Sequence, residues 1–393
     1  MPSRAGDGRV DPLAFRRRIR QPGTMPSLPL DHHAAPPNPH DPGSDAAGER
    51  ALAVEAAARE PLITRRGTSI RIGTASWTDP TMTAPGVFYP RGADSAEERL
   101  SYYAATFPIV EVDATYYAIP SARVAAAWVD RTPPDFVFDA KAHALMTGQP
   151  TEVKRLPKEL RSALPADLAS KARLYARDLP GEIVDEVWRL YLAGLEPLRA
   201  SGQLGSVLLQ FPKWFFPTSE SRDAILDARA RLDDVRSAVE FRSETWFNEK
   251  NRDRTLRFLA DNSIPLVMVD GPQGLRSSVP PLSAVTSRDL AVVRFHGRRV
   301  ETWEAAGIPV VERFRYLYSE DELRDWSLRI REAAEETREM HVLMNNCYAN
   351  YGSTNARELA AMLGDDLAAE PDGKTAEPDA PHESDLSAEV APQ

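Results

Sequence analysis

Ionisable side chains recur at a spacing of two near the ends of several short apolar runs. Glu111 and Asp113 alternate with valine and alanine in one run, and Glu240 and Arg242 flank Phe241 in another. Successive side chains of a strand point to opposite faces, so each run has one apolar face and one charged face. Buried charges cost free energy unless they pair or bind a ligand. The charged faces are therefore the predicted place of any chemistry.

Asp113 and Glu240 are the candidate general acid and base. Two carboxylates in one enclosed site repel each other, which raises one pKa toward neutrality and leaves the other group ionised. The alternative is a purely structural network, in which each carboxylate pairs with Lys141, Arg242 or Arg294.

Lys141 ends the third apolar run and His296 ends the seventh, and both are candidate catalytic residues. A lysine that stays charged beside Asp113 would hold an oxyanion, whereas a lysine desolvated beside an arginine would act as a general base or form a Schiff base. The first role is the expected one. Beyond His296, Arg298 and Asn355 are predicted anion ligands, because the last loops of parallel barrels often bind phosphate. The alternative for Arg298 is a solvated loop arginine.

Other polar and aromatic residues at or just past the run ends are predicted to bind a ligand. They are Trp77, Tyr116, Gln210, Arg242, Trp246, Asp270, Arg294, Asn345 and Asn346. Aromatic rings at a polar opening can stack on sugars or bases, although part of this set is expected to be ordinary packing. Together with paired carboxylates, they favour a small polar or anionic ligand.

We expect no cofactor. Only three histidines fall within the predicted barrel, too few for a histidine-rich zinc site, and His341 stands at the opposite end of its strand. The alternative is a single Mg²⁺ or Mn²⁺ ion held by Asp113, Glu240 and Asp270, because carboxylate oxygens are the ligands that these ions prefer.

Eight apolar runs, separated by helical patterns, must position these residues. The predicted strands are Ile70–Ser76, Ile109–Thr115, Phe136–Lys141, Ser206–Phe211, Ser237–Arg242, Pro265–Asp270, Ala291–His296 and His341–Asn346. The predicted helices are Ser95–Thr106, Ser121–Arg131, Ile183–Leu198, Ser219–Leu232, Arg252–Asn262, Ser319–Glu335 and Ser353–Leu363. This alternation predicts an α/β fold, a parallel (β/α)₈ barrel of the TIM type, with the ionisable residues at the carboxyl ends of the strands.

Two extensions are predicted on either side of the barrel of residues 62–364, and one long crossover is predicted within it. Residues 1–61 are rich in Pro, Gly, Asp and His and are predicted to be a disordered extension. Residues 365–393 hold nine acidic residues against Lys374 alone and are predicted to be a disordered acidic tail. The long crossover 142–203 between the third and fourth strands is either a lid beside the mouth or a surface elaboration.

The composition limits the cellular location and the classes of partner that we expect. Cys347 is the only cysteine, so no intramolecular disulfide can form, and no apolar run approaches the roughly 20 residues of a membrane span. We therefore expect a cytoplasmic protein without membrane contact. Nucleic acid is a possible but not a favoured partner, because no basic run is interleaved with aromatic residues.

Ordered motifs over residues 68–364 give the chain a resemblance to domain-of-unknown-function family 72, the YecE-like proteins. The matching segments are Ile72–Trp77, Gly86–Pro90, Tyr102–Tyr117, Pro134–Lys141, Leu208–Pro212, Val239–Arg242 with Trp246, Asp270, Arg294–Arg298, and Asn345–Asn346 with Asn355 and Ala356. The resemblance implies a barrel of this kind but no activity. Two positions depart from the family pattern, since Gly148 and Ser243 stand where the family often has histidine, so no histidine role is carried over there.

These observations leave two main functional hypotheses open. The first is a metal-independent enzyme acting on a sugar, sugar phosphate or nucleotide-like ligand, as a hydrolase or an isomerase. The second is a non-catalytic nucleotide or nucleic-acid binding module, which predicts a positive rim made of Lys213, Arg276, Arg298 and Arg299. A protein that binds partners through its terminal extensions is a third.

Overall fold

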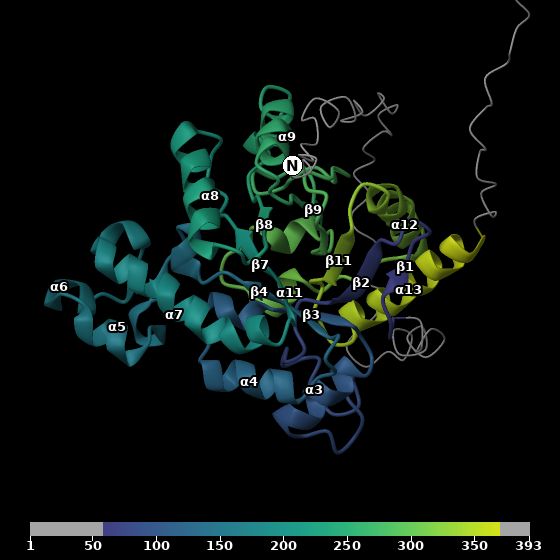
Figure 1. Ribbon diagram of the computed structural model, residues 1–393, viewed down its shortest axis with the longest axis horizontal. Helices are drawn as coiled ribbons and strands as arrows, with labels where there is room; N and C mark the ends of the chain where they lie inside the picture. Colours follow the sequence, from purple (N-terminus) through teal and green to yellow (C-terminus); the bar gives the residue numbers. More distant parts are fainter. Residues whose placement is uncertain (1–57, 370–393) are drawn as a thin grey trace, which may run out of the picture.

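Eight parallel strands curve around a common interior, with helices on the outside (Figure 1). The structure is a computed structural model and describes residues 58–369. The strands are β2 (Ser69–Thr74), β3 (Ile109–Val112), β4 (Val137–Lys141), β7 (Leu204–Gln210), β8 (Ser237–Glu240), β9 (Val267–Asp270), β10 (Ala291–Phe295) and β11 (Glu339–Met344). Their order around the sheet is β8-β7-β4-β3-β2-β11-β10-β9. Each predicted strand has its counterpart.

A single bridge closes the ring between its first and last strands. Val239 of β8 bridges Leu266, just before β9, and the Val239 N–H donates to the carbonyl of Pro265 at 2.8 Å. The short strand β1 (Leu62–Ile63) adds antiparallel to β2. The predicted parallel (β/α)₈ barrel is therefore confirmed, as a nearly closed barrel whose weakest seam lies between β8 and β9.

Helices follow the strands at the predicted places. They are α3 (Ala96–Ala104), α4 (Ala122–Asp130), α7 (Gly181–Ala200), α8 (Ser219–Leu232), α9 (Arg252–Asp261), α12 (Glu320–Ala334) and α13 (Tyr351–Ala369). α12 begins with a capping box, in which Ser319 and Glu322 each bond the other's backbone N–H. The short helices α10 (Val300–Trp303) and α11 (Val310–Arg313) precede it. α13 runs past Leu363 to Ala369, into the stretch predicted as tail.

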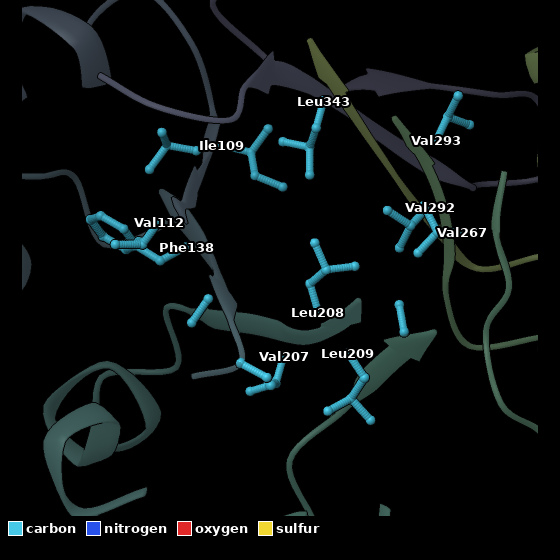
Figure 2. Close-up of a cluster of buried hydrophobic side chains, with 14 of the residues drawn as sticks. Ile109, Val112, Phe138, Val207, Leu208, Leu209, Val267, Val292, Val293 and Leu343 are labelled. Atoms are coloured by element: carbon cyan, nitrogen blue, oxygen red, sulfur yellow. The ribbon is translucent and has the colours of Figure 1, made fainter. Parts of the chain in front are cut away.

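The strands alternate between the barrel interior and the helix layer. Phe295 packs outward on Trp326 of α12, with ring centroids 5.2 Å apart, while its neighbour Arg294 points inward. Aliphatic side chains, among them Ile109, Leu208 and Leu343, fill the barrel between its polar groups (Figure 2). Buried aliphatic packing of this kind holds the inward charges in fixed positions.

The crossover after β4 carries a small substructure of its own before α7 returns to the sheet. β5 (Thr151–Glu152) pairs antiparallel with β6 (Arg173–Leu174), and α5 (Lys158–Ala163) and α6 (Ala166–Ala169) lie between them in the sequence. These two helices project away from the barrel (Figure 1).

The predicted extensions fall mostly outside the described residues 58–369. Residues 1–57 and 370–393, which hold most of the predicted disordered extension and tail, lie outside the described residues. Ala58, placed in the extension by the sequence, is buried in the core. Within residues 58–369, none of the helices has the length and the apolar character that a bilayer crossing requires.

Candidate active site at the barrel mouth

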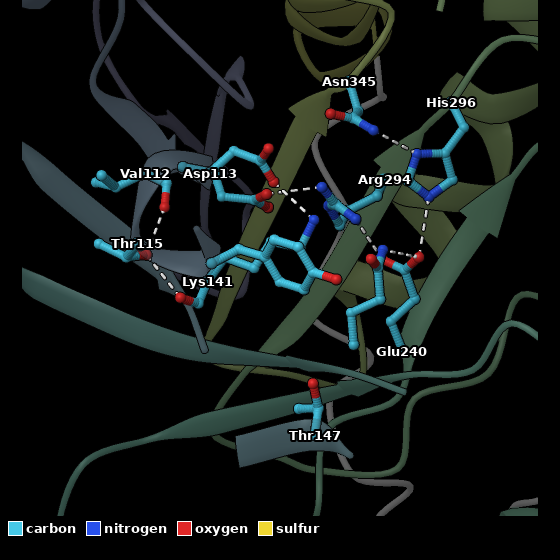
Figure 3. A network of polar contacts seen from close by, with 12 residues as sticks. Val112, Asp113, Thr115, Lys141, Thr147, Glu240, Arg294, His296 and Asn345 are labelled. Atoms are coloured by element: carbon cyan, nitrogen blue, oxygen red, sulfur yellow. Dashed lines mark hydrogen bonds and ion pairs between the residues drawn. The ribbon is translucent and has the colours of Figure 1, made fainter. Parts of the chain in front are cut away.

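Nine polar residues from six strands and the loops that follow them meet at the carboxyl-terminal end of the barrel, together with Glu111 just below them. We call this set of ten the mouth cluster. Its members are Glu111, Asp113, Tyr116, Lys141, Gln210, Glu240, Arg242, Arg294, His296 and Asn345. Hydrogen bonds and ion pairs join seven of them around Arg294 and Glu240, and Asp113, Lys141 and Tyr116 form a second group of contacts (Figure 3).

Arg294 of β10 is the centre of this cluster. It is completely buried and spans the barrel between two carboxylates, donating from Nη2 to Glu111 Oε1 at 2.6 Å and from Nη1 to Glu240 Oε2 at 2.5 Å. Both carboxylates are also completely buried. A buried guanidinium between two buried carboxylates is stable only because each charge is paired, so the three side chains depend on one another.

Glu240 of β8 is held as an anion. Its Oε1 accepts hydrogen bonds from Gln210 Nε2 at 2.7 Å and pairs with Arg242 Nε at 3.0 Å. Burial alone would raise the pKa of Glu240, but Arg294, His296 and Arg242 together lower it well below the ordinary value. Glu240 therefore stays ionised at any physiological pH.

His296 is neutral and has a fixed tautomer. Burial and the nearby Arg242 guanidinium lower the pKa of His296 to about 3. Its Nε2 lies 3.1 Å from the ionised Glu240 Oε1, which can only accept, so Nε2 carries the proton. Nδ1 is then a lone pair, and it accepts from Asn345 Nδ2 at 2.8 Å. Both ring nitrogens are therefore occupied, and His296 orients its neighbours. Neither nitrogen is free for the catalytic role that the sequence predicted.

Glu111 of β3 is the carboxylate whose protonation is poised near neutrality. Burial raises the pKa of Glu111 to about 7 despite the attraction of Arg294, and Asp113 adds to the rise. Its Oε1 pairs with Arg294, whereas Oε2 is buried with no hydrogen-bond partner among the described residues. The expected separation of two carboxylate pKa values is present, but between Glu111 and Glu240.

Asp113 and Lys141 form the outer layer of the mouth cluster. Lys141 Nζ donates to Asp113 Oδ1 at 2.7 Å, and the Asp113 side chain remains 29% exposed. The ammonium also sits 4.8 Å from the centre of the Tyr116 ring. The Tyr116 hydroxyl donates to Gln149, which in turn donates to the Gln210 carbonyl and so ties the crossover to the mouth. Lys141 thus has the neighbour that was expected to keep it charged.

Arg242 offers an open hydrogen-bonding edge next to this pair. Its guanidinium lies 4.7 Å from the centre of the Trp303 ring, and its Nη1 is buried without a partner among the described residues. Its Nε pairs with Glu240. An arginine stacked on an aromatic ring with a vacant N–H is suited to hold a carboxylate or phosphate.

Asp270 and Arg298 lie outside the barrel, which corrects their predicted place at the mouth. Both Asp270 oxygens are occupied, by Arg298 at 2.9 and 2.7 Å, by the Tyr318 hydroxyl and by Trp326 Nε1 of α12. Arg298 also pairs with Glu322 at 3.0 Å. The strand Val267–Asp270 contains a single polar residue, so its sequence does not show which face is polar. The partners of Asp270 are distant in the sequence, and Asp270 was therefore wrongly predicted to face the barrel interior.

Four further predicted ligand residues have contacts elsewhere in the fold. Asn346 and Asn355 are completely buried and bonded to each other at 2.9 Å, behind the strand ends. Trp77 packs edge-on against Trp128, and Trp246 stacks on Phe241 while donating to the Phe215 carbonyl. Asn355 and Trp246 are engaged by these hydrogen bonds and Trp77 by ring packing, which corrects their expected role in binding, whereas Asn346 keeps a buried Oδ1 without a hydrogen-bond partner among the described residues.

The rim that a nucleic-acid module would need is neutralised at three of its four predicted positions. Lys213 lies 3.6 Å from Glu304, Arg299 lies 3.8 Å from Glu312, and Arg298 is held by Asp270. The fourth, Arg276, is exposed.

Comparisons with known proteins agree with this fold. The family model described as "Protein of unknown function DUF72" matches residues 71–380. The chain belongs to the DUF72 family. It is 31% identical over 297 residues to the UPF0759 protein YunF of Bacillus subtilis (strain 168), a match that covers 75% of this chain and 94% of YunF.

Two crystal structures of DUF72 proteins show the same architecture. One, from Enterococcus faecalis V583, is 26% identical, has a TM-score of 0.57, and matches 75% of this chain and 97% of its own. The other, from Thermotoga maritima MSB8, is 29% identical, has a TM-score of 0.58, and matches 75% and 98%. The family resemblance seen in the sequence is thereby confirmed, and the matched range includes the whole mouth cluster of this DUF72 protein.

Sequence reasoning missed two important residues, Glu111 of the mouth cluster and Trp303 beside it. Glu111 was not among the predicted catalytic or ligand residues, although its position two residues before Asp113 in the same alternating run was the available signal. Trp303 lies in the short helix α10 after β10, far from any strand end, and no spacing pointed to it.

The oxygen ligand set considered for Mg²⁺ or Mn²⁺ is not assembled. Asp270 lies in the helix layer, while Asp113 and Glu240 face the interior. Within residues 58–369, no three His, Cys, Asp or Glu side chains are grouped so that they could hold a metal ion.

Proposed function

We propose that the mouth cluster is the active site of an enzyme that transfers a proton on a small polyhydroxylated, anionic substrate, such as a sugar phosphate. The observation that carries the proposal is Glu111: a buried carboxyl with a pKa near 7, one oxygen paired with Arg294 and the other without a partner. Such a group is half protonated at neutral pH, which suits it to both giving and taking a proton.

Asp113 is the residue that would meet the substrate. It lies two residues beyond Glu111, at the start of the 3₁₀ turn η1 (Asp113–Tyr116) that follows β3, and its side chain is partly exposed. In this proposal Asp113 exchanges the proton with the substrate, the charged Lys141 holds an oxyanion of the substrate, and Glu111 supplies or takes up the proton from below. An isomerase or a hydrolase would both use this arrangement.

Arg242 would hold the anionic group of the substrate. Its vacant Nη1 and its stacking on Trp303 leave a hydrogen-bonding edge free for a phosphate or carboxylate. Gln210 and Asn345 would bond hydroxyls nearby. The cluster would work without a metal ion, because the guanidinium groups of Arg294 and Arg242 already neutralise its carboxylates.

A ligand screen with two matched variants tests the binding half of the proposal. Sugars, sugar phosphates and nucleotides are screened by thermal shift, where a ligand at 100 times its Kd stabilises the protein by about 2.7 kcal/mol. Arg242→Gln should lose the shift of the anionic hit. Arg298→Gln is the control, because it removes the same charge from an arginine outside the barrel. Equal binding by both variants would contradict the role of Arg242.

Glu111→Gln tests the catalytic half. The amide keeps the shape of the side chain and its contact with Arg294 but cannot titrate. We expect kcat for the identified substrate to fall at least 100-fold, the lower end of general acid–base contributions, with KM changed less than about threefold. Unchanged kcat would exclude Glu111 from the reaction.

A further inference from the structure

The crossover substructure contains a groove that the mouth cluster does not use. Its volume is about 680 Å³, and six of its eight lining residues are exposed, so it is an open groove on the surface. It is formed between the β5–β6 pair and the helices α5 and α6. The lining residues are Glu152, Val153, Lys154, Arg161, Ala169, Lys171, Ala172 and Arg173.

Positive charge dominates this groove. Four of its lining residues are cations, and Glu152 is the single acid. Glu152 lies 3.2 Å from Lys154, 4.0 Å from Arg173 and 3.1 Å from Arg155 just outside the lining. Arg161 and Lys171 have no acidic partner in the described part of the chain. The single carboxylate of Glu152 offsets only part of the positive charge, and the lining residues keep a net charge of +3.

The local charge opposes that of the whole protein. The chain carries a formal net charge of −10, whereas residues 149–180 hold seven basic residues and four acidic ones. Three of the seven lysines of this arginine-rich chain, Lys154, Lys158 and Lys171, fall in this segment. A cationic concavity on an anionic protein attracts anions to one place and repels them from the rest of the surface.

The lining residues indicate how an anion would be recognised. The apolar part of the wall consists of Val153, Ala169 and Ala172, and no aromatic ring lines the cavity. Charge and hydrogen bonds are therefore available to a ligand, but no ring on which a base could stack. Arginine forks and lysine ammonium groups together suit the several oxygens of a phosphate chain.

We propose that this groove is a binding site for phosphate chains, which recognises the phosphates and not the group attached to them. The site stands apart from the catalytic proposal and does not depend on it. The groove nevertheless adjoins the mouth. Arg155, next to the lining residue Lys154, sits 5.4 Å from the centre of the Tyr117 ring, and Tyr117 packs on Tyr116 of the mouth cluster.

Calorimetric titration with inorganic tripolyphosphate at low salt tests the site. Arg161→Gln combined with Lys171→Gln should weaken binding at least tenfold. The control is Lys158→Gln combined with Arg177→Gln, which removes the same charge from exposed residues of the same substructure outside the lining. We expect the control to retain affinity within threefold. Equal losses in the two double variants would overturn the proposal and leave only general attraction by the segment, and no binding by the wild type would overturn it outright.

Two additional measurements sharpen the assignment. Glu152→Gln should bind tripolyphosphate severalfold more tightly, because Lys154 and Arg173 lose their internal carboxylate, and a gain of affinity cannot come from misfolding. ATP should bind within about threefold of tripolyphosphate, because no ring is available for its base. Much tighter binding of ATP, or a loss of tripolyphosphate binding in Arg242→Gln, would place the ligand in the mouth instead of the groove.

Discussion

The barrel interior holds two polar clusters that differ in how completely their carboxylate oxygens are paired. The base cluster, near the amino ends of the strands, consists of Arg71, Asp139, Ser206, Arg236, Glu339 and His341. In it, all four carboxylate oxygens have partners. Asp139 binds Ser206 and His341, and Glu339 binds Arg71, His341 and Arg236. In the mouth cluster, by contrast, Glu111 keeps one buried oxygen without a partner.

Two buried histidines show how strongly neighbours decide protonation. His341 lies 2.8 Å from Asp139 and 3.1 Å from Glu339, and these carboxylates raise its pKa to about 8 against the effect of burial. His296 is equally buried, but burial and Arg242 lower its pKa to about 3. The same residue type is thus a structural cation at one end of the barrel and a neutral orienting group at the other.

Substitution of Arg294 should lower the free energy of unfolding more than any other change considered. In Arg294→Met, Glu111 and Glu240 would be left buried without their shared cation, so we expect the free energy of unfolding to fall by about 3–5 kcal/mol. Urea denaturation measures this change. Adding Glu111→Gln and Glu240→Gln to Arg294→Met should recover much of the loss, because no unpaired charge then remains. A triple variant as unstable as the single one would show that the charges are not the cause.

His341→Gln should have the next largest effect, and the effect should depend on pH. The folded protein holds the His341 proton up to a pKa of about 8, whereas the unfolded chain releases it near 6.5. The stabilisation is therefore complete below pH 6.5 and is lost as pH rises through 8. We expect the variant to lose about 1–3 kcal/mol at pH 6 and distinctly less at pH 9. A loss independent of pH would indicate that His341 is neutral in the fold.

Much of this arrangement could be read from the sequence, and the failures share one cause. Alternation within Ile109–Thr115 and Ser237–Arg242 correctly turned Asp113, Glu240 and Arg242 inward, because polar and apolar residues there mark the two faces. In β9 the valines fill the interior and Asp270 faces Trp326, a partner 56 residues away that no local pattern reveals. Whether a polar side chain binds a ligand or a distant helix is decided by tertiary contacts.

Glu111→Gln separates function from stability in the mouth cluster. Burial raises the pKa of Glu111 to about 7, so the folded wild type holds a proton that the unfolded chain releases near pH 4.5, and its stability falls as pH rises between these values. The variant should lose this slope while its free energy of unfolding at neutral pH stays within about 1 kcal/mol of the wild type. Denaturation midpoints measured from pH 5 to 8 check this. A slope unchanged by the substitution would assign the titration to another group.

Arg298→Gln should have the smallest effect and tests the boundary between the barrel interior and the helix layer. Asp270 would keep its hydrogen bonds from Tyr318 and Trp326, and the Arg298 side chain is one-third exposed, so we expect a loss of about 1 kcal/mol or less. Because Arg298 faces the helix layer, the thermal shift produced by a ligand of the mouth cluster should stay the same. A loss of that shift would show that Arg298 contacts the ligand, as the sequence predicted. It would also indicate that this protein uses the phosphate-binding loop typical of such barrels.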